Sequence, residues 1–145
     1  FVNLYVLEQQ LFSKIINANT VDELYILFGK GVTEFWRTHY TFKTVSKKSK
    51  KNISKSFIDL LIINTIIPLK FTYAKAKGEN IEEELFDLIK NLKIEKNSIV
   101  DKYLQLRTIE KNALSSQALL QLKTFYCDKN NCLQCAIGNS LIIKN

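Results

Sequence analysis

The three cysteines of the chain lie close together, as Cys127-x4-Cys132-x2-Cys135. The two-residue gap lets Cys132 and Cys135 face one metal ion from a tight turn, and Cys127 could add a third thiolate. A structural zinc ion needs a fourth ligand, for which the only histidine, His39, is the best candidate and Asp128 a poorer one. A zinc site is therefore one hypothesis, and an iron–sulfur cluster is less favoured because a fourth cysteine is lacking. Packed reduced thiols and a Cys132–Cys135 disulfide are the alternatives.

A second feature that could do chemistry is a basic segment at residues 37–55, which holds seven bases and no acid. The bases are Arg37, Lys43, Lys47, Lys48, Lys50, Lys51 and Lys55. The whole chain has 21 Lys and Arg against 14 Asp and Glu, a net charge of +7. Outside the basic segment the numbers of bases and acids are therefore equal. The positive electrostatic potential of this segment attracts polyanions. Lysine side chains suit contacts to phosphate groups better than sequence-specific hydrogen bonds to bases.

Aromatic residues adjoin the basic segment: Phe35, Trp36, His39, Tyr40 and Phe42. Rings of this kind stack exposed bases beside a charged groove in proteins that bind single strands. The combination predicts a contact with nucleic acid that does not depend on base sequence.

Two other interpretations of the basic segment stay open. Lysine-rich loops are ordinary soluble surface, and aromatic side chains more often build a core than stack on bases. In addition, residues 79–87 hold five acids and no base, namely Glu79, Glu82, Glu83, Glu84 and Asp87. An acidic helix there could fold against the basic segment and screen it.

Catalytic motifs are not visible in the sequence. It contains no phosphate-binding glycine loop of the G-x-x-x-x-G-K or G-x-G-x-x-G type, and its one histidine supports no Ser-His-Asp arrangement. We therefore expect no catalytic residue in this chain and do not expect it to be an enzyme by itself.

The elements that must position these residues are predicted to be helices. One Pro and four Gly argue against a turn-rich β protein. Capping signals and helical spacing predict helices at about 2–17, 20–29, 33–42, 56–78, 80–92, 98–106, 115–127 and 133–143. Ser56 is the expected cap of the long apolar helix, with Asp59 in its first turn, and Pro68 is expected to kink it. The prediction is one all-α domain over residues 1–145, with six to eight helices around that central helix, a basic loop at 43–55 and a cysteine cluster at 127–135.

Membrane association and export are not expected from the sequence. The apolar run at 57–71 is interrupted by polar residues and falls short of the ~20 apolar residues that a membrane span needs. The first ten residues lack the features of a signal peptide, and few cysteines with many lysines fit a reducing cytoplasm. Because the chain has no Met and starts at Phe1, we expect it to be part of a longer protein.

Several motifs resemble those of a known family: residues 35–40, 55–65, 116–119, 126–129 and 132–138. They are similar to the C-terminal part of an uncharacterised bacterial family, a domain of unknown function. Longer members look similar, in their N-terminal part, to a metal-dependent restriction-endonuclease core. The resemblance thus implies a helical accessory domain of a cytoplasmic nuclease-like protein, whose catalytic site would lie outside this chain. A helical scaffold or protein-interaction module, whose basic loop docks its acidic helix, the missing N-terminal domain or another protein, is the alternative.

Overall fold

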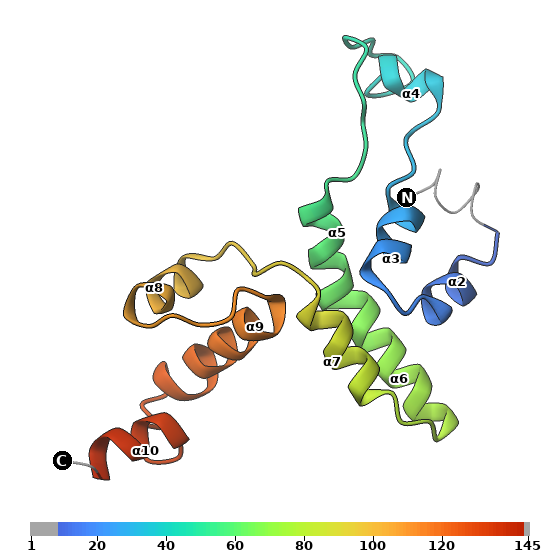
Figure 1. The fold of residues 1–145 in the computed structure, drawn as a ribbon. Coiled ribbons are helices and arrows are strands. Elements are labelled where there is room, and N and C mark those ends of the chain that lie inside the picture. The colour runs from blue at the N-terminus through green and yellow to red at the C-terminus, as the bar shows by residue number, and fades with distance from the viewer. Residues whose placement is uncertain (1–8, 144–145) are drawn as a thin grey trace. The chain divides into compact units, whose positions relative to one another are not determined.

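The computed structural model describes residues 9–143, and within this range helices joined by loops are the regular secondary structure (Figure 1). The described part contains nine α-helical segments and two π-helical turns, which join into eight continuous helices, and no strand. The predicted all-α fold is confirmed, and most predicted helices begin and end within a few residues of the observed ones. The first predicted helix is observed only from Leu11: Gln9 and Gln10 form a turn, and residues 2–8 of the prediction lie outside the described residues.

The helices form two compact units, Phe1–Leu88 and Ile89–Asn145, each described here by itself. The first unit contains α2 (Leu11–Asn17), α3 (Val21–Phe28), α4 (Glu34–Thr38), α5 (Lys55–Leu61), α6 (Ile67–Lys77) and most of α7 (Glu82–Lys90). The second contains α8 (Ser98–Leu106), α9 (Ala113–Gln121) and α10 (Ala136–Ile143).

The core of the first unit is built on one long helix, in which α5 and α6 are joined without a break. Ile58, Ile62 and Ile66 are almost fully buried along it, and Leu24 of α3 is completely buried. The spacing of four residues puts the three isoleucines on one face of the helix, and α3 contacts α5. This helix is therefore the central element that the apolar sequence predicted.

Pro68 does not divide the central helix. The disturbance is a π-helical turn at Ile62–Ile66, where the N–H of Ile67 donates to the carbonyl of Ile62. A proline nitrogen cannot donate, and its ring crowds the carbonyl four residues earlier, which is that of Asn64. The wider turn just before the proline is the local form that this crowding takes.

The start of the central helix differs from the prediction. Ser54 is the cap, because its hydroxyl accepts from the backbone N–H of Phe57, and the Ser56 hydroxyl lies 3.2 Å from that of Ser54. Asp59 does not serve the helix dipole of the first turn but accepts a hydrogen bond from the Tyr25 hydroxyl of α3. The carboxylate therefore ties two helices together.

Other caps follow the sequence signals closely. Thr20 and Glu23 form the predicted capping box at the start of α3. Gly78 ends α6 with a φ of 75°, a left-handed conformation that glycine adopts without steric cost.

The second unit packs around Leu92, Val100, Ala113 and Ser116, all nearly or fully buried. The backbone N–H of Ala113 donates to the carbonyl of Leu92 at 3.0 Å, which joins the chain before α8 to the start of α9. Asn112 caps α9 by accepting from Ser115 at 2.9 Å, so this helix begins two residues earlier than predicted.

By length and composition alone, Lys55–Lys77 could cross a membrane. The core helix of a globular unit meets the same criterion, and this helix buries one face against its neighbours. The finding is weak evidence either way.

Candidate nucleic-acid interface

The basic segment lies between α3 and α5 and forms a loop with α4 (Figure 1). Here α4 ends at Thr38 rather than at the predicted residue 42, because the next residues fold back. The backbone N–H of Tyr40 donates to Thr44 at 3.0 Å, and that of Ser46 donates to Thr38 at 2.7 Å. The loop tip is thus a hydrogen-bonded turn.

Side-chain hydroxyls hold the same turn from within. The Thr41 hydroxyl accepts from the backbone N–H groups of Lys43, at 3.3 Å, and Thr44, at 3.0 Å. At the base of the loop, a Cβ added to Gly31 would lie 3.1 Å from Oδ1 of Asn52, so the two ends of the loop run side by side. The loop therefore has a defined shape although most of its residues lie outside the short helix α4.

Four of the aromatic residues form one cluster. The rings of Phe35 and His39 stack at 4.1 Å, and Trp36 packs edge-on against Phe35 at 5.0 Å. Phe42 lies 5.2 Å from Trp36 and still has 80% of its surface exposed, while Tyr40 is 70% exposed. The cluster of Phe35, Trp36, His39 and Phe42 thus leaves the Phe42 ring largely in solvent, and the Tyr40 ring near it in the chain is exposed as well.

Three of the seven bases are engaged within the loop itself. Glu34 pairs with Lys48 at 2.6 Å and with Arg37 at 3.0 Å, and these two cations hold the pKa of its carboxyl below the usual value. Lys51 donates to the carbonyl of His39 at 2.8 Å and sits 3.9 Å above the Tyr40 ring. Lys51 is therefore a structural residue of the loop.

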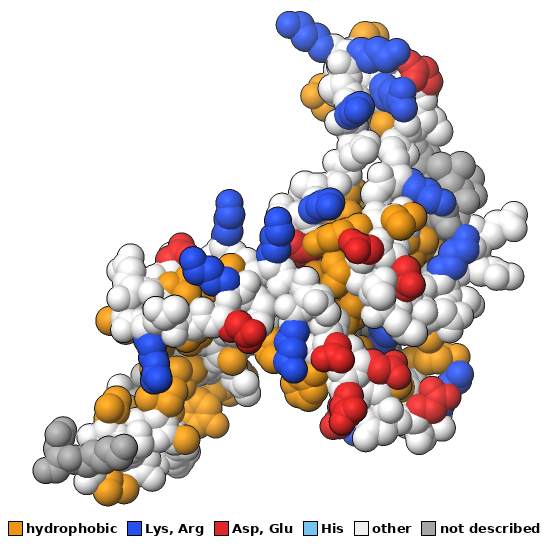
Figure 2. Space-filling view, viewed as in Figure 1, with side chains coloured by type: hydrophobic (Ala, Val, Ile, Leu, Met, Phe, Trp, Pro, Cys, Tyr) orange, Lys and Arg blue, Asp and Glu red, His pale blue; other side chains and the backbone are white. Residues whose placement is uncertain are grey.

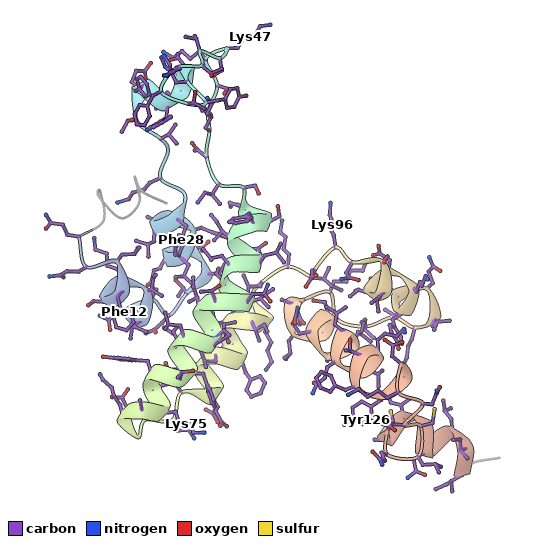
Figure 3. All side chains as sticks on the ribbon, turned by 180° about the vertical axis from the view of Figure 1, so that it is seen from behind. Phe12, Phe28, Lys47, Lys75, Lys96 and Tyr126 are labelled. Atoms are coloured by element: carbon purple, nitrogen blue, oxygen red, sulfur yellow. The ribbon has the colours of Figure 1, made fainter. Side chains whose placement is uncertain are left out.

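Lys43, Lys47 and Lys50 are different. All three are exposed, and within the described residues their side chains make no hydrogen bond or ion pair. Figure 3 shows Lys47 pointing outward from the loop. The fourth remaining base, Lys55, lies 4.8 Å from the Tyr25 ring at the start of α5. The loop thus offers a small set of cations that nothing in the described structure neutralises.

The acidic residues near α7 were the alternative partner for these cations. Across the described part of the chain, no ion pair joins the basic segment to Glu79, Glu82, Glu83 or Glu84. Glu79 pairs instead with Lys77, at 3.9 Å. In Figure 2 the Lys and Arg side chains gather over the loop that carries α4, and acidic side chains gather over α7. The interpretation that the acidic helix covers the basic segment is not supported by these contacts.

His39, the expected fourth metal ligand, serves the loop. Its Nδ1 lies 3.0 Å from the carbonyl of Phe35 and 3.0 Å from the Thr38 hydroxyl, and its ring is stacked. The histidine thus closes the end of α4.

The cysteine cluster has mixed surroundings. Cys127 and Cys132 are exposed, and Cys135 is buried. The Cys127 sulfur lies 3.4 Å from the Tyr103 hydroxyl; this hydrogen bond, burial and the neighbouring thiols raise the pKa of Tyr103 to about 12. No group of three His, Cys, Asp or Glu side chains within residues 9–143 is arranged to hold a metal ion. The metal site stays a prediction without support from this geometry.

One buried charge was missed from the sequence. Lys70 of α6 is 4% exposed, and its ammonium donates to the carbonyls of Ile16, at 2.7 Å, and Ala18, at 2.5 Å. These carbonyls lie at the C-terminal end of α2, where carbonyl groups have no hydrogen-bond donor within the helix, and the lysine supplies that donor. Desolvation lowers the pKa of Lys70, and Glu84 and Glu23 partly oppose this. The only available signal was a lysine within an apolar run.

Together these features define an all-α protein in which a basic, aromatic-bearing loop is set between two core helices. The chain belongs to the DUF2851 family, described as a protein of unknown function, whose family model matches residues 1–98. The predicted membership of an uncharacterised family is confirmed. The matched part includes the whole basic segment and ends before the cysteine cluster. No curated protein and no solved structure matches the chain.

Proposed function

We propose that the chain is a non-catalytic helical module that binds the backbone of nucleic acids through its basic segment. The observation that carries this proposal is the loop charge: Lys43, Lys47 and Lys50 are exposed and make no ion pair within the described residues. A phosphate backbone that meets such cations releases its counterions, which favours binding regardless of base sequence.

The resemblance noted above extends the proposal to the longer protein. In it, the module would accompany a restriction-endonuclease-like part in the cytoplasm and hold DNA or RNA near that catalytic site. This agrees with the lack of catalytic motifs in the sequence of this chain.

Salt dependence of binding tests the proposal. Fluorescence anisotropy of a labelled DNA or RNA of mixed sequence would be followed from low to physiological salt. If three lysines each neutralise one phosphate, the logarithm of the affinity falls with the logarithm of salt concentration with a slope of about 2 to 3.

The decisive variant changes Lys43, Lys47 and Lys50 to Glu and leaves the structural Lys51 in place. A matched control changes Lys75, Lys96 and Lys102 to Glu; these are exposed lysines elsewhere in the chain (Figure 3 labels the first two). Loss of binding in the first variant alone supports the proposal. Absence of binding at low salt, or equal loss in both variants, refutes it.

A second candidate function is protein interaction, and the exposed apolar side chains of the second unit favour it. They are Leu106, Phe125, Leu133, Ile137, Leu141, Ile142 and Ile143, all more than half exposed. Such residues are typical of a surface that another protein covers. A structural metal at the cysteines belongs to this candidate, and zinc and iron analysis of anaerobically purified protein tests it. Clearly substoichiometric metal ends the metal hypothesis.

A further inference from the structure

Phe42 places an exposed aromatic ring at the tip of the loop. Phe42 packs against Trp36 at 5.2 Å and Phe35 at 6.0 Å, yet 80% of its surface faces solvent. The turn that carries it is fixed by backbone and threonine hydrogen bonds. A large apolar ring held outward on a defined turn costs solvation without adding to the core. It is thus a natural contact for a flat apolar partner.

The exposed lysines stand beside this ring in the sequence. Lys43 follows Phe42 directly, and Lys47 and Lys50 come a few residues later in the chain. An exposed ring followed in the chain by exposed cations matches the chemistry of a nucleotide, which joins a flat base to a charged phosphate.

We propose that Phe42 stacks on an unpaired base and that the loop thereby prefers single-stranded nucleic acid over duplex. Bases of a duplex are already stacked on each other and offer their faces only at ends or kinks, whereas each base of a single strand has an accessible face. The inference rests on the proposed function, because the lysines supply the backbone contact that brings the base to the ring.

An anionic membrane surface is the other partner that takes aromatic rings and lysines together. The loop fits it less well. The Tyr40 ring carries the ammonium of Lys51 at 3.9 Å, so inserting the ring would carry a charge toward the lipid. The Thr41 and Thr44 hydroxyls, 2.9 Å apart, also flank Phe42 on both sides along the chain. These polar neighbours favour stacking in water over insertion.

Trp36 offers a direct readout. It is the only tryptophan of the chain, and its ring lies next to that of Phe42, so its fluorescence reports on the tip without a label. Titration of the full chain with an oligothymidylate of about 15 nucleotides should quench this emission, whereas a duplex hairpin of mixed sequence should change it little.

Substitutions at the ring separate stacking from charge. Phe42→Leu keeps an apolar side chain against Trp36 but removes the aromatic face. It should weaken binding of the oligothymidylate about 5- to 140-fold and leave both the salt slope and duplex binding unchanged. Phe42→Trp should restore binding, and Phe86→Leu, at an exposed phenylalanine of α7, should have no effect.

The outcomes distinguish the two proposals. Equal affinity for single strand and duplex, or an unchanged affinity in Phe42→Leu, overturns this inference while the backbone contact stands. No binding to either nucleic acid overturns both. Binding to phosphatidylserine vesicles that depends on Phe42, with no preference for the oligothymidylate, assigns the loop to membranes and also overturns the inference.

Discussion

Replacing Lys70 with Met tests how the first unit holds α2. Methionine keeps most of the aliphatic stem within α6 but removes the ammonium that donates to Ile16 and Ala18. Two carbonyls at the end of α2 then lose their donors in a site that is only 4% exposed. The substitution is expected to lower the free energy of unfolding.

The size of this loss follows from two opposing effects. A hydrogen bond from a charged donor contributes about 1.5 to 3 kcal/mol, and two are lost. Against this, burying an ammonium costs several kcal/mol, and methionine removes that cost. The lowered pKa of Lys70 reflects this desolvation. A net destabilisation of about 1 to 3 kcal/mol at neutral pH is expected.

The pKa direction adds a second, independent prediction. The folded protein binds its proton on Lys70 less tightly than the unfolded chain, whose lysines titrate near 10.5. Below that value, the unfolded state therefore holds more protons, and stability rises with pH as the folded pKa is crossed. The stability difference between wild type and Lys70→Met should widen in that window. The raised pKa values of Tyr25 and Tyr103 act with the opposite sign above pH 10, equally in both proteins.

Urea unfolding followed by far-UV circular dichroism measures both effects, at neutral pH and at about pH 9.5. Lys75→Met is the matched control, because this exposed lysine lies on the same helix. A Lys70→Met variant as stable as the control at neutral pH would contradict the assigned role of Lys70. A difference from wild type that shrinks as the pH rises would contradict it as well.

Three further predictions concern other contacts. Tyr25→Phe removes the hydrogen bond to Asp59 and should lower the free energy of unfolding by about 1 to 3 kcal/mol in the same urea assay; an unchanged midpoint would show that the tie is not formed. Cys127→Ala should return the pKa of Tyr103 from about 12 toward the ordinary 10.0 in an ultraviolet absorbance titration, and a titration identical to wild type contradicts the contact. Changing the three glutamates that begin α7 to Gln should alter nucleic-acid affinity less than about twofold at physiological salt; a large gain would indicate that α7 screens the basic segment.

The sequence predicted best what short-range signals determine. The capping box at Thr20 and the end of α6 at Gly78 depend on residues within one helical turn, and both are observed. The early end of α4 escaped prediction because the helix was extended to residue 42 on aromatic spacing alone, although residues 39–42 include poor helix formers and the Thr41 hydroxyl bonds favour a turn.

Contacts between distant residues could not be predicted. The Tyr25 hydroxyl meets Asp59, 34 positions away, and Lys70 reaches Ala18, 52 positions away. Each is a polar group in an apolar element, and the sequence indicates only that such a group needs a partner. Which partner it finds depends on how the helices pack. For the candidate site, the sequence predicted a basic segment but not which of its bases are engaged within the loop: only the geometry separates Lys51, held inside, from Lys47.

The net charge of +7 is not what makes the loop a candidate for binding polyanions. Within residues 1–88, the part outside the basic segment has five bases and ten acids, while residues 89–145 have nine bases and four acids. The charges outside the basic segment therefore sum to zero only because an excess of acids in residues 1–88 cancels an excess of bases in residues 89–145. At physiological salt, charges act over about 8 Å, so a phosphate responds to the side chains beside it and not to the total. A polyanion thus meets the basic loop as a local site, although the rest of the same unit repels it. This locality is why substitutions at three lysines, and not the overall charge, decide whether the proposed interface exists.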